Sequence, residues 1–161
     1  YYGVFNNILT KVCFPDNAFT VHPYYLVPPT SIDGPTIDFV VTHVGEAQNP
    51  PIFFLEIKPP LYLDHIYSRV DADAQMRARF LALYEDTPTP RLHGVSAMGQ
   101  RLAFYCLDKT TTLINPHYVA PSTKYIIDTI PAERWDKDIT TEEGYKRLMA
   151  VIDDVKQMAA A

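Results

Sequence analysis

The chain has 161 residues, of which 47% are hydrophobic and 20% are charged, and this composition fits one globular domain that buries a core of its own. The formal net charge of −5 argues against a strongly basic surface that binds nucleic acid without specificity, but it is compatible with a local basic patch or an acidic metal site. The two cysteines have no metal-like spacing, so we expect reduced thiols in an intracellular protein. No apolar run approaches the ~20 residues of a membrane span, so we expect no membrane partner.

Residues 1–45 predict a helix followed by two strands. The apolar residues of "YYGVFNNILTKVC" fall at positions 1, 4, 5, 8, 9 and 12, which is a helical period. The stretch "FTVHPYYLVPP" at residues 19–29 is aromatic and β-branched with a proline inside, which favours an edge strand or a bulged strand. After a turn at residues 30–35, "TIDFVVTHVG" predicts the second strand over residues 36–45.

The stretch "PIFFLEIK" at residues 51–58 predicts a third strand, which two prolines end. A loop centred near residue 47 separates it from the second strand. Both strands are nearly continuous apolar runs, a pattern typical of a sheet that is covered on both faces. The sequence therefore favours the α/β class, with a mixed sheet between layers of helices.

The rest of the chain predicts two long helices with a hairpin between them. One helix is expected over about residues 63–84, and two strands follow at residues 91–99 and 100–108. Residues 109–128 are strand-like but interrupted by proline, and their pattern assigns no definite structure. The last helix is expected to begin near Thr140, capped by Thr140 with Glu143. Its apolar stripe is expected to face the core and consists of Tyr145, Leu148, Met149, Ile152 and Val155.

Three charged residues on the second and third strands suggest a chemical site. Side chains alternate along a strand, so Glu56 and Lys58 share a face. If the two strands pair as a hairpin about residue 47, residue 38 lies opposite residue 56, and Asp38 joins them. A slip of one residue would move Asp38 to the other face, so the grouping is a hypothesis about register.

Apolar neighbours surround these three charges, and leaving one unpaired would cost several kcal/mol. Either the three form an ion network of their own, or they bind a ligand. Two carboxylates a few ångströms apart repel each other unless a proton or a cation lies between them, and a hard cation such as Mg²⁺ takes such oxygens together with water and phosphate. A neighbouring ammonium group would then orient a water molecule or stabilise charge on phosphate oxygens.

The pattern "IDFVV … FFLEIK" resembles the core of the PD-(D/E)XK nuclease superfamily, which has the restriction-endonuclease-like fold. In that family one strand of a hairpin carries the first acid and the next strand carries acid-x-lysine, within a core of helix, three strands, helix and strand. That order matches the expected elements as far as residue 107. The resemblance implies that Asp38 and Glu56 bind Mg²⁺ (or Mn²⁺), with the backbone carbonyl of Ile57 as a third ligand, and that Lys58 orients the water that attacks a phosphodiester.

The chain departs from the family pattern at a few positions. Ile37 stands where many members have proline, and the first helix offers Asn6 and Asn7 where many members carry a glutamate. The helix after the motif supplies Gln75 as a supporting catalytic residue. Arg79 stands where a tyrosine would complete the Q-x-x-x-Y pattern.

Four arginines are the predicted contacts to nucleic acid. Arg69, Arg77 and Arg79 lie in the charged stretch "SRVDADAQMRARF", where they would either reach phosphates or pair with acids of the same helix, as Asp73 would with Arg77. Arg101, just past the turn of the predicted hairpin, is also placed to reach a ligand.

Several interpretations of residues 1–161 stay open at this point. The first is a nuclease domain that acts on DNA or RNA, for which the resemblance also allows a homodimer. The second is a nuclease-like domain without activity that binds nucleic acid or protein; the negative net charge and the missing helix glutamate favour it. The third is an α/β domain in which Asp38, Glu56 and Lys58 merely pair. Because the sequence starts at Tyr1, we expect further domains in a longer parent chain.

Overall fold

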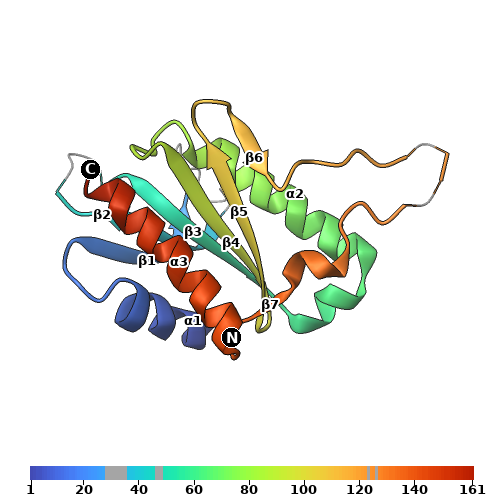
Figure 1. The fold of residues 1–161 in the computed structure, drawn as a ribbon, viewed down its shortest axis with the longest axis horizontal. Coiled ribbons are helices and arrows are strands. Elements are labelled where there is room, and N and C mark those ends of the chain that lie inside the picture. The colour runs from blue at the N-terminus through green and yellow to red at the C-terminus, as the bar shows by residue number, and fades with distance from the viewer. Residues whose placement is uncertain (28–35, 46–48, 123, 126) are drawn as a thin grey trace.

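The computed structural model describes residues 1–27, 36–45, 49–122, 124–125 and 127–161, which form a mixed sheet flanked by helices (Figure 1). The first part comprises α1 (Tyr2–Ile8), a π-helical turn (Leu9–Cys13), β1 (Phe19–Leu26), β2 (Thr36–His43) and β3 (Pro51–Lys58). These elements follow the predicted helix and strands closely. The predicted turn at residues 30–35 and the centre of the predicted loop, residues 46–48, lie outside the described residues.

The second part contains the predicted helix, hairpin and last helix. It comprises a short 3-10 helix (Pro60–Asp64), α2 (Ile66–Leu83), β4 (Arg91–Met98), β5 (Arg101–Asp108), β6 (Leu113–Asn115), a second 3-10 helix (Ala132–Trp135), β7 (Lys137–Asp138) and α3 (Glu142–Ala159). Gly99 takes a φ of +61° in the turn between β4 and β5, a conformation that favours glycine. β6 supplies the strand within the stretch 109–128 that the sequence pattern left unassigned.

The sheet has the order β1-β2-β3-β4-β5-β6, and β7 pairs with β5. β3 and β4 are parallel, and the other neighbouring strands are antiparallel. A parallel pair needs a crossover connection, which α2 provides. The predicted class, a mixed α/β sheet with the order helix, three strands, helix, strands and helix, is confirmed. β1 lies at the edge, as its proline predicts.

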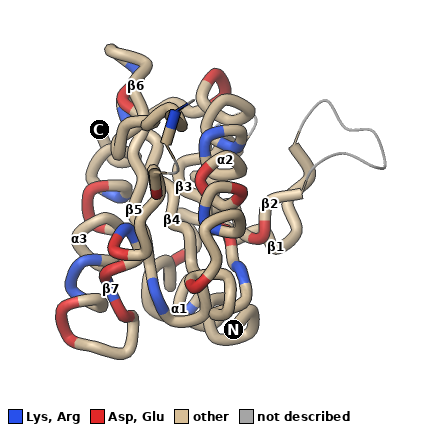
Figure 2. Tube along the Cα trace, turned by 90° about the vertical axis from the view of Figure 1, so that its right-hand side faces the viewer, with Lys and Arg blue, Asp and Glu red and all other residues tan. Residues whose placement is uncertain are grey.

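Helices cover both faces of the sheet, as the apolar strands predict. Figure 2 shows α3 and α2 on opposite sides of the strands, with many of the charged residues along these two helices. α1 and α3 pack on the face that carries Phe39, Phe53 and Leu55, whereas α2 packs on the face that carries Val40 and Phe54. No helix in the described ranges combines the length and the apolar character that crossing a membrane requires.

The cap and the packing of α3 differ from the prediction in detail. Thr141, and not Thr140, is the N-cap, and its Oγ1 accepts a hydrogen bond of 3.1 Å from the amide of Gly144. Thr140 bonds to Asp138 instead. The predicted stripe contains Tyr145, but this side chain is exposed, because the stripe that packs on the sheet starts one turn later.

Both cysteines are free thiols. Cys13 lies in the core between α1 and the sheet, where burial raises the pKa of its thiol to about 12. Burial also raises the pKa of Cys106 on β5. Neither thiol has the lowered pKa that a nucleophilic cysteine needs.

Candidate active site

The β2–β3 hairpin brings Asp38 and Glu56 to the same position along the sheet. Phe39 pairs with Leu55 in the antiparallel ladder, so the same register continued by one residue sets Asp38 opposite Glu56. The register predicted from the loop position is therefore confirmed. Asp38 Oδ2 also accepts a hydrogen bond of 2.7 Å from the amide of Ile57, which fixes this carboxylate against β3.

α1 supports the backbone of Asp38. The hydroxyl of Tyr2 donates a hydrogen bond of 3.0 Å to the carbonyl of Asp38. The Tyr2 ring stacks on Tyr24, with 4.8 Å between ring centroids, and on Phe39, with 4.5 Å. Burial raises the pKa of Tyr2 to about 12, so its hydroxyl keeps its proton and remains a donor. The first helix therefore contributes a tyrosine hydroxyl to this region.

Glu56 is buried on the α2 face of the sheet and pairs with Arg79. The distance from Arg79 Nε to Glu56 Oε1 is 2.7 Å, and Arg79 Nη2 also donates to the carbonyl of Thr36 at 2.8 Å. The sequence predicts phosphate contacts for Arg79 and does not indicate this pair. Arg79 reaches Glu56 because it lies on the side of α2 that faces the sheet.

Burial raises the pKa of the Glu56 carboxyl to about 7. The hydrogen bond and charge of Arg79 lower this pKa, the charge of Asp38 raises it, and the charge of Lys58 lowers it. The loss of hydration outweighs the arginine, so the carboxyl exchanges its proton near neutral pH. A buried acid beside a second acid has the perturbed pKa that is common at functional sites.

Lys58 ends β3 and is half-buried, and its ammonium group has no acid within ion-pair distance among the described residues. The expected alternative, an ion network of Asp38, Glu56 and Lys58, is therefore not formed among the described residues. Glu56 pairs with Arg79 instead, and Asp38 bonds to a backbone amide. The carbonyl of Lys58 accepts a hydrogen bond of 3.0 Å from Gly99, which ties the end of β3 to the β4–β5 turn.

Gln75 lies one helical turn before Arg79, so the two residues share a side of α2. The Gln75 side chain is half-buried and forms no hydrogen bond within the described part of the chain. Its predicted supporting role stays a prediction.

The donor set at this hairpin fits a hard divalent cation. Within the described ranges, no hydrogen-bond donor contacts Asp38 Oδ1 or Glu56 Oε2, so each carboxylate has one oxygen left to bind a ligand. Two carboxylates, with water and phosphate, are the usual ligands of Mg²⁺ in enzymes that act on phosphates. The described residues contain no group of three or more His, Cys, Asp or Glu side chains placed to hold a metal, so any ion here would depend on this pair.

The four arginines predicted to touch nucleic acid all have partners within the protein. The guanidinium of Arg69 is buried, pairs with Asp128 and donates to the carbonyls of Ile130 (2.8 Å) and Leu63 (2.7 Å). This burial does not fit the predicted phosphate contact of Arg69. Arg101 Nε donates to a backbone carbonyl at 3.1 Å. Phosphate contacts of Arg77, Arg79 and Arg101 stay predictions.

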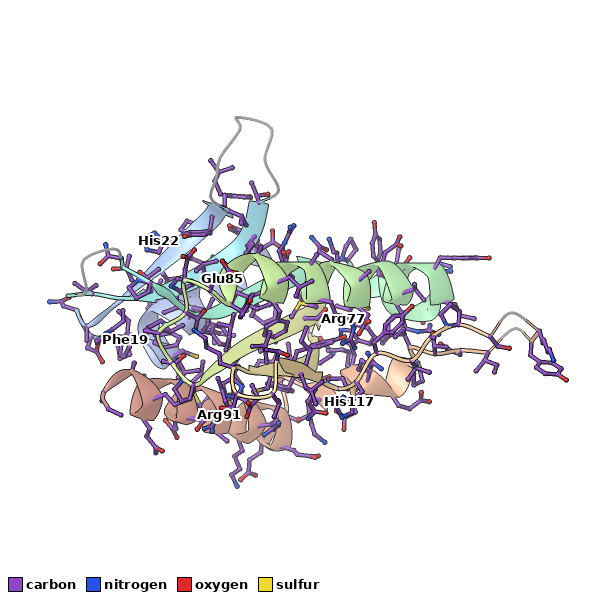
Figure 3. All side chains as sticks on the ribbon, turned by 90° about the horizontal axis from the view of Figure 1, so that it is seen from above. Phe19, His22, Arg77, Glu85, Arg91 and His117 are labelled. Carbon is purple, nitrogen blue, oxygen red and sulfur yellow. The ribbon has the colours of Figure 1, made fainter. Side chains whose placement is uncertain are left out.

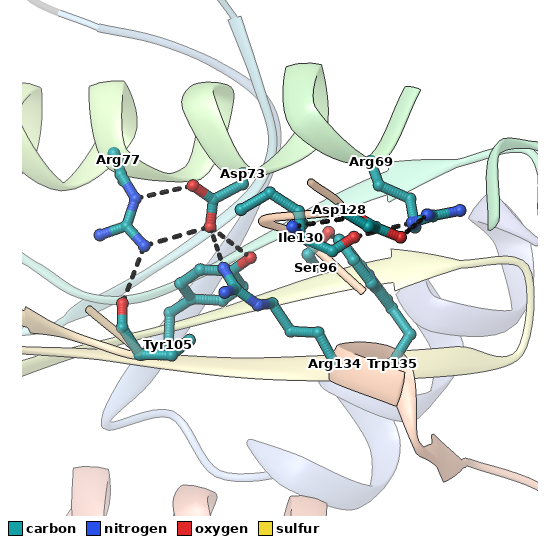
Figure 4. Close-up of polar contacts among 10 residues, drawn as sticks. Arg69, Asp73, Arg77, Ser96, Tyr105, Asp128, Ile130, Arg134 and Trp135 are labelled. Carbon is teal, nitrogen blue, oxygen red and sulfur yellow. Dashed lines mark hydrogen bonds and ion pairs between the residues drawn. The ribbon is translucent and has the colours of Figure 1, made fainter. Parts of the chain in front are cut away.

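Asp73 is the centre of a buried cluster that joins α2, β5 and the second 3-10 helix (Figure 4). Arg77 Nε donates to Asp73 Oδ2 at 2.7 Å, which confirms the pair expected from their spacing on the helix. Arg134 pairs with Asp73 Oδ1, and the hydroxyl of Tyr105 donates to the same oxygen at 3.0 Å. Arg134 and Tyr105 lie 61 and 32 residues from Asp73, so no local pattern in the sequence indicates their contacts with it.

Figure 3 shows Arg77 between α2 and the chain segment that carries His117. Arg77 Nη2 donates to the carbonyl of Pro116 at 2.8 Å, and its guanidinium lies 5.7 Å from the ring centroid of Tyr118. These contacts join the segment after β6 to α2. Arg91, by contrast, lies beside α3 in the same view and pairs with Asp154.

The comparisons with known proteins give one partial similarity. No protein-family model matches the chain, and no curated protein matches it in sequence. The chain is similar to a solved structure described as that of the type IIG restriction endonuclease BpuSI, with a TM-score of 0.49 and 13% sequence identity. The match covers 99% of this chain but 16% of that chain. Similarity at this TM-score and identity does not by itself support a family or a function.

Proposed function

We propose that the protein is a nuclease that depends on a divalent metal and hydrolyses phosphodiester bonds of DNA or RNA. The observation that carries the proposal is the position of Asp38 opposite Glu56, each with one carboxylate oxygen that no described donor contacts. Lys58, two residues further along β3, has an ammonium group without an acid partner in the described ranges. These residue types and this spacing are the ones that the resemblance to PD-(D/E)XK nucleases requires.

Asp38 and Glu56 would hold Mg²⁺ or Mn²⁺, with the backbone carbonyl of Ile57 as a third ligand. When bound, the ion would stabilise negative charge on the phosphate and make a bound water more acidic. Lys58 would donate hydrogen bonds to the attacking water and to a phosphate oxygen, and so orient the first and balance the charge of the second. Gln75 would support the same water or phosphate through its amide group.

Arg79 orients the Glu56 carboxylate in the proposed site. It neutralises the buried Glu56 carboxylate through Oε1 and leaves Oε2 to the ligand. The amide of Ile57 does the same for Asp38 through Oδ2. Each carboxylate is therefore oriented by one oxygen before a ligand binds to the other, which lowers the entropy cost of assembling the site.

The test is cleavage of plasmid DNA, single-stranded DNA and RNA with Mg²⁺ or Mn²⁺, with EDTA as the metal-free control. We expect Lys58→Ala to slow cleavage by about 100-fold or more, as is typical when a donor to developing charge is removed. Lys146→Ala is the matched control, because Lys146 is an exposed lysine on α3. Equal cleavage by Lys58→Ala and the unchanged protein would refute the proposed mechanism.

The ion pair between Glu56 and Arg79 favours a second candidate function. A guanidinium already neutralises one of the two acids, as it would in a nuclease-like domain that has lost its metal and binds nucleic acid or protein without cleaving. Calorimetry with Mn²⁺ separates the two candidates, because a module of this kind would bind no metal at millimolar concentration. A homodimer, further domains and an intracellular location stay predictions under either function.

A further inference from the structure

Tyr24 on β1 has a backbone conformation that is unusual for its residue type. Its φ is +51°, in the left-handed region that favours glycine and, less often, asparagine. Residues held in such conformations are concentrated at functional sites, where the side chain must take a particular direction. The proposed cleavage reaction assigns no part to Tyr24, so its side chain is a candidate for a function of its own.

The left-handed residue exchanges the faces to which the side chains of β1 point. Val21 packs on the α1 face of the sheet, whereas Tyr25 packs on the α2 face. Residues four apart in a regular strand would share a face. The exchange brings the Tyr24 ring to the α1 side, where it stacks on Tyr2 with 4.8 Å between ring centroids. A regular strand would turn this ring the other way.

Stacking on Tyr2 leaves the Tyr24 side chain largely exposed. Tyr24 is 64% exposed, and β1 is the edge strand of the sheet, so one face of the ring lies on Tyr2 and the other is open to solvent. The hydrophobic gain is therefore small for so large a side chain. Asparagine or glycine would take the same φ at a lower cost. Packing within the chain thus does not account for an aromatic ring at this position.

Tyr24 lies beside Asp38, the first acid of the proposed metal site. Both neighbours of Tyr24 on β1 pair with the two neighbours of Asp38 on β2, so these two residues lie opposite each other. Neighbouring strands are ~4.8 Å apart. The hydroxyl of Tyr2, on which the Tyr24 ring stacks, also donates to the carbonyl of Asp38 at 3.0 Å. The open ring is thus next to a proposed metal ligand.

The carboxylate of Asp38 lies between two strands. The last pair of the β2–β3 ladder is Phe39 with Leu55, and the carboxylate bonds to the amide of Ile57 beyond that pair. It therefore occupies the gap between the ends of β2 and β3. A nucleic-acid strand that crosses this gap would bring a phosphate to the Asp38–Glu56 pair and a neighbouring base to the open ring.

We propose that Tyr24 is a base-stacking residue and that the nucleic acid bound at this site is single-stranded. Every nucleobase has a face on which an aromatic side chain can stack. In a duplex the neighbouring bases cover these faces, so the exposed ring finds a free base on a single strand. The inference rests on the proposed function, because it names the substrate of the same site, but stacking itself requires neither metal nor cleavage.

Fluorescence anisotropy of a labelled octanucleotide, as a single strand and as a duplex, tests the proposal in EDTA, where metal-dependent cleavage does not occur. We expect the unchanged protein to bind the single strand more tightly than the duplex. Tyr24→Asn should weaken binding of the single strand by at least about fivefold, the loss of one stacked base, and should leave binding of the duplex unchanged. Because asparagine tolerates the left-handed conformation, this variant should fold normally.

Two further variants separate the ring from the position. Tyr24→Phe keeps the ring and should bind the single strand normally. Tyr145→Asn removes an exposed tyrosine of α3 and is the matched control, which should also bind normally. Loss of binding in Tyr24→Phe as large as that in Tyr24→Asn would show that the ring face is not what the strand contacts, and would overturn the inference.

The inference is also wrong if Tyr24→Asn binds the single strand as tightly as the unchanged protein, if the duplex loses as much, or if the unchanged protein binds no single strand at about 0.1 mM. These outcomes are independent of the proposed cleavage. A protein that cleaves with Mg²⁺ but gives one of these results remains a nuclease without this stacking residue. A protein that shows the expected losses and cleaves nothing keeps the stacking residue and loses the proposed activity.

Discussion

Glu56 and Asp73 are both buried acids that arginines of α2 neutralise, yet their remaining contacts differ. Both oxygens of Asp73 have donors, from Arg77, Arg134 and Tyr105. Glu56 has one arginine on one oxygen, and a second acid, Asp38, lies opposite on the neighbouring strand. Asp73, with donors on both carboxylate oxygens, can anchor the fold. Glu56, with a donor on one oxygen in the described part of the chain, can still bind a ligand through the other.

The surroundings of Asp73 carry more positive charge than those of Glu56. Asp73 lies between two guanidinium groups, so its negative charge is more than balanced. Glu56 and Asp38 are two negative charges near Arg79 and Lys58, and burial still raises the pKa of Glu56 to about 7. Removing the charge of Asp73 should therefore harm the fold at every pH, whereas the cost of removing the charge of Glu56 should become smaller as pH rises.

The largest expected effect on stability comes from Asp73→Asn. The substitution leaves two nearly buried guanidinium groups without their counter-charge, and we expect the free energy of unfolding to fall by about 3–5 kcal/mol. Urea denaturation measures the change. Asp71→Asn, at an exposed position of the same helix, is the control and should change the stability by less than about 0.5 kcal/mol. Similar losses in the two variants would contradict the anchoring role of Asp73.

A smaller and pH-dependent effect is expected from Glu56→Gln. The folded-state pKa of Glu56 is about 7, against 4.5 for an unperturbed glutamate, so the folded protein binds more protons between these values. The free energy of unfolding that Glu56 contributes therefore falls as pH rises through this window. Glutamine does not ionise, so between pH 4.5 and pH 8 the stability difference should shift towards the variant by up to about 3 kcal/mol.

Urea denaturation of the two proteins in EDTA, at pH 5 and at pH 8, measures this shift. The other titrating groups are present in both proteins and cancel in the difference. A stability difference that is the same at both pH values would show that Glu56 titrates normally and would weaken the contrast with Asp73.

The smallest effect is expected from Tyr105→Phe. It removes one of the donors to Asp73 and leaves both arginines in place, so the loss should be about 1 kcal/mol. Thermal or urea denaturation measures it, with Tyr84→Phe as the control, because the Tyr84 hydroxyl makes an exposed contact of 3.4 Å. A loss near that of Asp73→Asn would mean that the tyrosine and not the arginines holds this cluster together.

The sequence predicted the parts of the fold that depend on local patterns. The continuous apolar runs of β2 and β3 predicted a sheet covered on both faces, and the position of the loop predicted the register that sets Asp38 opposite Glu56. Register follows from loop position because a hairpin pairs residues about its turn, although this ladder shifts by one residue between Val41 and Thr42.

Contacts between distant elements could not be predicted in this way. The pair of Arg79 with Glu56 depends on how α2 turns as it packs on the sheet, and the pair of Arg134 with Asp73 joins residues 61 positions apart. Neither contact leaves a period or a spacing in the sequence. A charged helix face was therefore interpreted as a phosphate-binding surface, although in the structure its arginines are bonded to the protein.

Calorimetric titration of Mn²⁺ into the protein and into Asp38→Asn tests the central claim most directly, with Asp71→Asn as the control. If the Asp38–Glu56 pair holds a metal, the unchanged protein and Asp71→Asn will bind one Mn²⁺ per chain at millimolar metal, and Asp38→Asn will bind it about tenfold or more weakly. No binding by the unchanged protein, or equal binding by Asp38→Asn, would contradict the claim that this hairpin is a metal site.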